Sequence, residues 1–130
     1  MNYRNYRNQK GQALVETALS IGILFLIVFG ITEFGRAMYI WNTLNNAARA
    51  GARYGAVSKP YDVPAITEYV KDAAPKNVVF LNISVIPPSG QPNTGDTIRV
   101  KVQETKFQSV VPNLIPITNT LTGTASMRYE

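Results

Sequence analysis

One glutamate, Glu16, stands at the start of the longest apolar run in this chain. Residues 17–32 contain no charged side chain, and Gly11 and Gln12 precede Glu16 in the stretch KGQALVE. A carboxylate at the edge of an apolar segment is costly unless it reaches water or meets a positive charge. Two explanations therefore stay open. Glu16 lies at headgroup depth, where it also suits the positive end of the helix dipole, or it pairs with a positive charge from another chain.

The residue inventory argues against an enzyme. The 130 residues include no cysteine and no histidine, which excludes disulfides, thiolate or imidazole metal ligands, and Cys-His or Ser-His catalysis. We expect no catalytic residue, no metal, no cofactor and no small-molecule substrate.

The basic charge is concentrated at the N-terminus. The formal net charge is +5, but Arg4, Arg7 and Lys10 supply three of the 13 basic residues, and the remaining ten face eight acidic ones. Arg49 and Arg53 lie one helical turn apart without interleaved aromatic residues, so they indicate a solvated face or a link to a neighbouring subunit. We expect no nucleic-acid partner.

The apolar run is long enough to cross a membrane. At about 1.5 Å per residue it gives roughly 24–30 Å of helix, close to the hydrocarbon thickness of a bilayer. The basic residues before it predict a single-pass protein of the cytoplasmic membrane, with the N-terminus in the cytoplasm and the C-terminal part outside. The alternative is a cleavable secretory signal, but the nearest small-residue cleavage site, Ala48-Arg49-Ala50, lies far beyond the run.

Helical spacing continues past the membrane segment, and no proline occurs before Pro60, so one helix is expected from Gln12 to Val57. Two adjoining rows of its second half lack bulk, at four-residue steps. These rows predict close packing, either under a sheet or between the helices of neighbouring subunits. The helix-packing residues are Ala47, Gly51, Gly55, Ala48, Ala52 and Ala56.

The remaining residues change period. Residues 64–75 read as a short helix with Pro64 at its first position and an apolar face of Ile66, Tyr69, Val70 and Ala73. Apolar and polar residues then alternate over 81–85, 98–103 and 121–129, which indicates three half-buried strands. The fold class is therefore α+β. A long N-terminal helix, half in the membrane and half soluble, packs on a small three-stranded antiparallel sheet.

The segment KGQALVE resembles the processing site of class III type IV prepilins, in which a short basic leader ends in glycine and a glutamate follows at the fifth position. The resemblance implies that a prepilin peptidase cuts between Gly11 and Gln12. It further implies that the new Gln12 amine pairs with Glu16 of a neighbouring subunit and sets the register between helices. Slippage would leave two unpaired charges in a dry core.

Residues 29–57 and 124–130 resemble the TadE family of pseudopilins in the tight-adherence (Tad, or Flp pilus) system. The resemblance implies a pilin-like fold and a minor pilin or pseudopilin subunit. The implied organisation is a leader at 1–11, a transmembrane helix at 12–32 and an extracytoplasmic pilin-like domain at 33–130. The implied partners are the membrane, a prepilin peptidase, other pilin subunits and the pilus assembly machinery, in a filament that serves cell adhesion. The alternative is an uncleaved, signal-anchored binding module.

Overall fold

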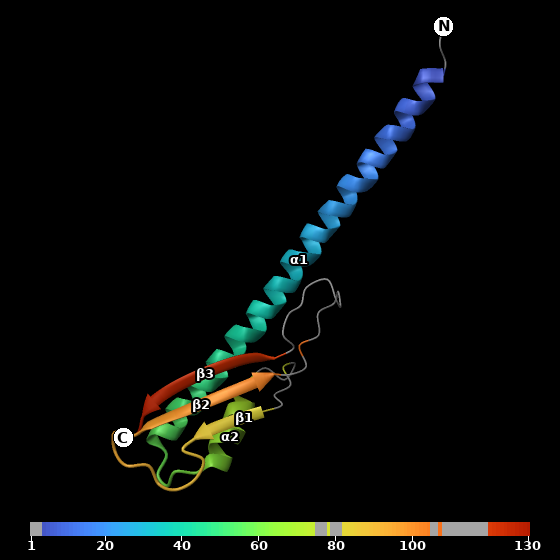
Figure 1. Cartoon of the computed structure of the whole chain (residues 1–130). Coiled ribbons are helices and arrows are strands. Elements are labelled where there is room, and N and C mark those ends of the chain that lie inside the picture. The colour runs from blue at the N-terminus through green and yellow to red at the C-terminus, as the bar shows by residue number, and fades with distance from the viewer. Residues whose placement is uncertain (1–3, 75–77, 79–81, 105–106, 108–119) are drawn as a thin grey trace. The chain divides into compact units, whose positions relative to one another are not determined.

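The structure is a computed structural model that describes residues 4–74, 78, 82–104, 107 and 120–130, with the backbone alone for residues 4–10. The chain divides into two compact units, Met1–Gly35 and Arg36–Glu130, and each is described by itself. Its elements in order are α1 (Arg4–Val57), α2 (Val63–Asp72), β1 (Asn82–Ile86), β2 (Thr97–Glu104) and β3 (Leu121–Arg128) (Figure 1). The first unit consists of the N-terminal part of α1, and the second contains all the other elements.

The helix ends at Val57 as the sequence predicts, but it begins at Arg4, ahead of the expected start at Gln12. Residues 4–10 are mainly Asn, Arg, Gln and Lys, and neither glycine nor proline interrupts them before Gly11. Nothing in that stretch therefore breaks the backbone hydrogen-bond ladder. The short helix α2 has a proline in its first turn, as expected, and ends at Asp72.

The three strands form one antiparallel sheet in the order β1-β2-β3. The register pairs Val85 with Val100 and Val100 with Ala125, so the apolar residues of all three strands share one face. Ile98, Val100 and Val102 are completely buried, while the alternating residues Arg99 and Lys101 are exposed. The predicted alternation is confirmed for 82–85 and 98–103, and for 121–129 with the exception of Met127, which is exposed. Leu81 lies outside the described residues.

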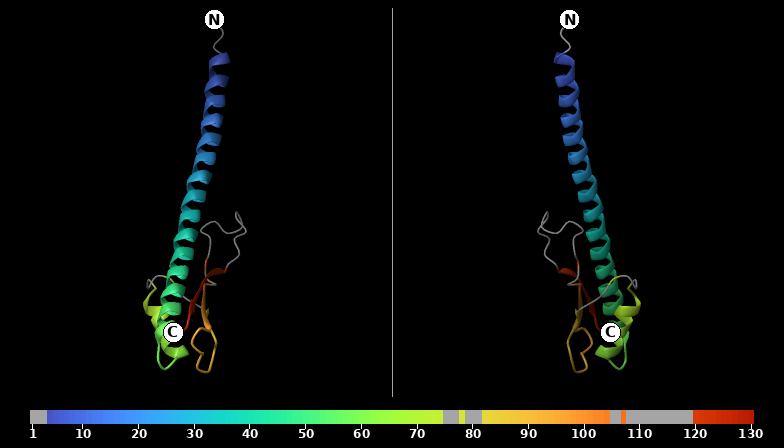
Figure 2. Two further views of the ribbon diagram at one scale, coloured as in Figure 1. Left: turned by 90° about the vertical axis from the view of Figure 1, so that its left-hand side faces the viewer. Right: turned by 90° about the vertical axis from the view of Figure 1, so that its right-hand side faces the viewer.

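The core of the second unit lies between this sheet face and two helices, the C-terminal part of α1 and α2 (Figure 2). Leu44 from α1 and Ile66 and Val70 from α2 are completely buried there. Tyr69 and Ala73 were expected on the same face of α2, but both are exposed. Tyr69 stacks on Tyr54 of α1, and Ala73 is the C-cap residue that follows the last residue of α2. The fold is α+β with a long N-terminal helix packed on a three-stranded antiparallel sheet, a pilin-like arrangement.

Two tyrosines, Tyr61 and Tyr129, join chain segments at the end of the second unit where β1 ends. The Tyr61 hydroxyl donates to the Pro87 carbonyl at 2.8 Å, and the Tyr129 hydroxyl donates to the Ser58 carbonyl at 3.1 Å. Their rings meet edge to face with centroids 6.2 Å apart. Burial raises the pKa of Tyr61 above its ordinary value. These contacts fasten the loop after α1 to the loop between β1 and β2 and to the end of β3.

Candidate functional site

Gly11, Gln12 and Glu16 lie on α1 within the first unit, and all three are exposed. Gln12 and Glu16 are four residues apart, so they lie on the same side of the helix, one turn from each other. Helical side chains lean toward the N-terminus, which directs the Glu16 carboxylate toward Gln12. The geometry brings together a carboxylate and the residue that would carry a new amine after cleavage.

The helix passes through the Gly11-Gln12 peptide bond without a break. Proteases act on extended backbone, so cleavage there requires the first turns to unwind. Glycine eases that step because it weakens a helix by roughly 0.5–1 kcal/mol relative to alanine. Gly11 also has open space where a side chain would be, with nothing within 4 Å of an added Cβ.

The helix that follows Glu16 has an apolar surface all round. The large apolar side chains of residues 14–31 are 47% to 71% exposed, and this is the one described helix long and apolar enough to cross a membrane. The Thr17 and Thr32 hydroxyls donate to the carbonyls of Ala13 and Val28, both at 2.8 Å. The hydroxyls of these two threonines are thus satisfied within the helix, as a lipid environment requires of polar groups. Glu16 lies within the N-terminal end of this surface, two residues after Leu14.

The two rows of small residues lie in the second unit and are buried there. A Cβ added at Gly51 would meet the Val70 side chain of α2, and one added at Gly55 would lie 2.9 Å from Ile66 Cδ1. Ala48 and Ala52 are completely buried in the core cluster, together with Ala47. The chain's own α2 and sheet therefore occupy the face formed by Ala47, Ala48, Gly51, Ala52, Gly55 and Ala56.

One close approach was missed by the sequence analysis. A Cβ added at Gly123 in β3 would collide with the backbone of α1 at Leu44 and would lie 2.6 Å from the Asn45 nitrogen. The Asn45 side chain accepts a hydrogen bond from the Thr124 backbone N–H at 3.3 Å. The outer edge of β3 is thus partly satisfied by the helix, as an exposed sheet edge needs. The available signal was a glycine on the inward side of an alternating strand.

The last residue of β2, Glu104, carries a buried carboxylate. Glu104 is 7% exposed, and its Oε2 has no hydrogen-bond partner among the described residues. Burial raises the pKa of Glu104, and the nearby Arg36 guanidinium lowers it by a smaller amount. Arg36 itself lies over the Phe107 ring, 4.7 Å from the centroid. This cluster connects α1 to the end of β2 inside the second unit.

We predict that Glu104→Gln stabilises the folded domain at neutral pH. Because the pKa of Glu104 is higher in the folded than in the unfolded chain, the charged carboxylate costs stability. That cost is absent below the unfolded pKa, grows as pH rises, and is complete above the folded pKa. We expect a gain of about 1 kcal/mol at pH 7 that vanishes near pH 4. Denaturant unfolding of the detergent-solubilised chain, followed by near-UV circular dichroism, measures it.

The matched control for this prediction is Glu68→Gln on the exposed face of α2. It removes the same charge from a solvated position, so the free energy of unfolding should change little at either pH. A Glu104→Gln chain that is less stable than the parent at pH 7 would show that attraction to Arg36 outweighs burial.

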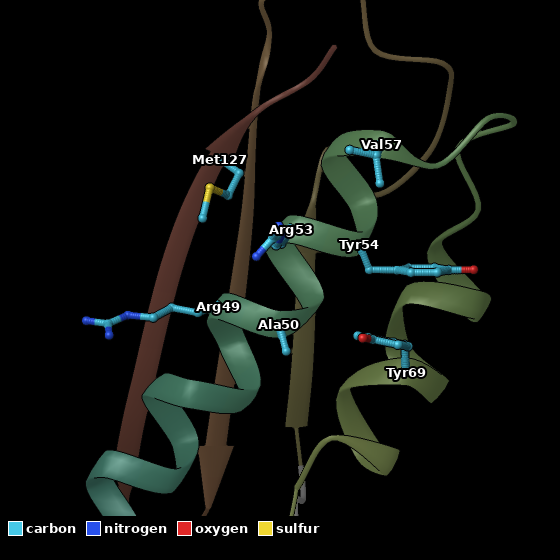
Figure 3. A pocket seen from close by; sticks show the side chains of 7 residues that line it. All are labelled: Arg49, Ala50, Arg53, Tyr54, Val57, Tyr69 and Met127. Carbon is cyan, nitrogen blue, oxygen red and sulfur yellow. The ribbon is translucent and has the colours of Figure 1, made fainter.

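An open hollow of about 520 Å³ lies over the outward side of α1 in the second unit (Figure 3). Tyr54 of α1 and Tyr69 of α2 stack at one border, with ring centroids 4.6 Å apart and planes at 13°. At the other border are Met127 of β3 and the two arginines of α1. The lining residues are Arg49, Ala50, Arg53, Tyr54, Val57, Tyr69 and Met127.

The N-terminal part of the chain matches a known protein family. Residues 11–53 match the family model described as TadE-like protein. The matched range begins at Gly11, includes Glu16 and the apolar helix, and ends among the small residues of the second unit. No match was found among curated proteins or among solved structures. Among the described residues there is no group of three or more His, Cys, Asp or Glu side chains that could hold a metal ion.

Proposed function

We propose that this chain, whose residues 11–53 belong to the TadE-like family, is a minor pilin or pseudopilin subunit in the assembly of a Tad-type pilus or a related secretion filament. The match to the TadE-like family over residues 11–53 includes the N-terminal apolar helix that a pilin-like subunit needs. The observation that carries the proposal is Glu16, an acid that begins an apolar helical surface five residues after Gly11.

Assembly would proceed from the membrane. A prepilin peptidase removes the leader at 1–11, which leaves the transmembrane helix at 12–32 with a free amine on Gln12. The N-terminus faces the cytoplasm, in agreement with Arg4, Arg7 and Lys10 ahead of the span. The domain that follows, residues 33–130, lies outside the membrane and contacts other pilin subunits and the assembly machinery.

Glu16 and the Gln12 amine would set the register between subunits. Each helix places the two groups one turn apart, so the carboxylate of one subunit can form an ion pair with the amine of the next in a low-dielectric core. A shifted arrangement leaves both charges unpaired, and breaking a buried pair costs about 3–5 kcal/mol. The pair thus selects one axial arrangement among many that apolar contact alone would allow.

The test is the mass of the mature protein, extracted from membranes with and without the matching peptidase. We expect loss of residues 1–11 when the peptidase is present, and an N-terminal Gln12 with a free amine. An intact leader would contradict the proposal and favour the signal-anchored binding module. A cyclised Gln12, formed with loss of ammonia, would contradict the pairing with Glu16 because it carries no positive charge.

Gly11→Leu should block this processing, because a bulky side chain hinders the approach of the backbone to the peptidase and strengthens the helix at the cut. Gly22→Leu is the matched control: Gly22 also has open space around it, and it lies well inside the apolar segment. Mass spectrometry should find the leader on the first variant and not on the second.

A further inference from the structure

The hollow on the outward side of α1 has the composition of a protein interface. Arginine, tyrosine and methionine are enriched at such interfaces and carry much of their binding energy. Here two arginines, two stacked tyrosines and Met127 border one surface. Arg49 and Arg53 are exposed and follow each other at one helical turn, so they form a basic row along this surface.

The complementary charge lies on the same chain. The side of α2 that faces away from buried Ile66 and Val70 carries Pro64, Glu68 and Asp72, all exposed and spaced at one helical turn. Glu68 and Asp72 therefore form an acidic row with the same spacing as the basic row on α1, and the exposed Lys71 lies beside it. Rows of residues four apart are the ridges by which helices pack on each other.

We propose that the hollow binds a second copy of this chain, with the outward face of its α2 lying on the outward face of α1. Glu68 and Asp72 of one copy then lie against Arg49 and Arg53 of the other, and the stacked tyrosines and Met127 border the contact. This proposal rests on the proposed function and adds to it the identity of one neighbouring subunit.

The contact joins two different surfaces, so it is heterologous. Each copy offers both a basic row and an acidic row, and a third copy can join at either side. Contacts of this kind continue into open helical assemblies unless the rotation between copies closes a ring. The paired charges also disfavour the contact of two like surfaces, because two basic rows would face each other.

Cysteine cross-linking in the full chain tests the contact directly, since the native sequence has no cysteine. One tagged copy carries Ala50→Cys in the hollow and a differently tagged copy carries Ala65→Cys beside the acidic row. The two are produced together with the assembly machinery and treated in membranes with a short bifunctional thiol reagent. We expect a link between the two tags. Ser126→Cys, exposed on the open face of the sheet, replaces Ala50→Cys in the control and should give no link.

Charge reversal is the second test of the contact. Arg49→Glu with Arg53→Glu in the Ala50→Cys copy should lower the linked fraction at least tenfold, and Glu68→Arg with Asp72→Arg in the Ala65→Cys copy should restore it. All four positions are exposed, so near-UV circular dichroism should be unchanged. A link of Ala50→Cys to itself, a link to a different protein, or a linked fraction that ignores charge reversal would overturn the proposal.

The outcome separates this inference from the proposed function. If the leader is removed and the chain enters the assembly without the Ala50-to-Ala65 link, only the contact between copies is wrong. If the leader is retained and no assembly forms, the proposed function fails first.

Discussion

Glu16→Gln is expected to enter the membrane and lose its leader normally, but to fail to join assemblies. The substitution keeps the size of the side chain and removes its charge, so the Gln12 amine of a neighbouring subunit has no carboxylate to meet. Membrane insertion should survive because the apolar residues 17–32 are unchanged. Quantitative blotting of membrane and sheared-filament fractions, together with the N-terminal mass, measures the separate steps.

The expected size of the effect follows from the energy of an unpaired buried charge. Removing one partner of such a pair costs about 3–5 kcal/mol, and each 1.4 kcal/mol is a factor of ten in an equilibrium constant. Incorporation should therefore fall by roughly 100-fold or more. Glu16→Asp is the matched control, because it retains the carboxylate and should retain much of the incorporation. Normal incorporation of Glu16→Gln would reduce Glu16 to a residue at headgroup depth.

Production of Glu16→Gln together with the parent chain tests whether the pair joins two chains or lies within one. A variant subunit still offers its Gln12 amine to a neighbour but cannot accept the next one. If the pair is between chains, the variant should stop growth and suppress incorporation of the parent chain. If Glu16 pairs with the amine of its own chain, the variant should be excluded and the parent chain should assemble normally.

The type and the order of the helices and strands could be predicted from the sequence, because each element follows from a local period of apolar residues. Residues 98–103 alternate between apolar and polar, which placed Ile98, Val100 and Val102 on the buried face. The same alternation, continued by one residue, would have placed Glu104 inward as well. The expected alternation ended at Gln103, whereas β2 continues to Glu104.

Features that depend on the distance between elements were not available from the sequence. Tyr69 has the spacing of a core residue on α2, but the stacked ring of Tyr54 on α1 holds it outside the core. Gly123 was equally hidden, because a glycine in a strand says nothing about which helix approaches it. Processing between Gly11 and Gln12 and the pairing of the Gln12 amine with Glu16 were inferred from the motif, and both stay predictions.

Gly123→Ala is expected to destabilise the second unit strongly. Among the described glycines, Gly90 and Gly95 have a positive φ, and Gly123 does not. Alanine therefore fits the backbone at position 123, and the expected effect is steric. The new methyl group would collide with the main chain of α1 at Leu44, and a helix backbone cannot rotate away as a side chain can. Separation of β3 from α1 would also weaken the hydrogen bond from Thr124 to Asn45.

The loss in the free energy of unfolding should exceed the value of about 1–3 kcal/mol that is typical of overpacked cores. Such a loss is a large part of the total free energy of unfolding of a domain, which is about 5–15 kcal/mol. The free energy of unfolding in denaturant should be compared across three glycine-to-alanine variants that differ in the space around the new methyl group. Gly51→Ala should cost less, because the new methyl group meets a methyl group of the Val70 side chain and not the main chain. Gly35→Ala has nothing within 4 Å and should be neutral or stabilise the helix by up to about 1 kcal/mol. Equal effects at Gly123 and Gly35 would mean that β3 does not approach α1 this closely, and the packing of the helix on the sheet would need to be redrawn.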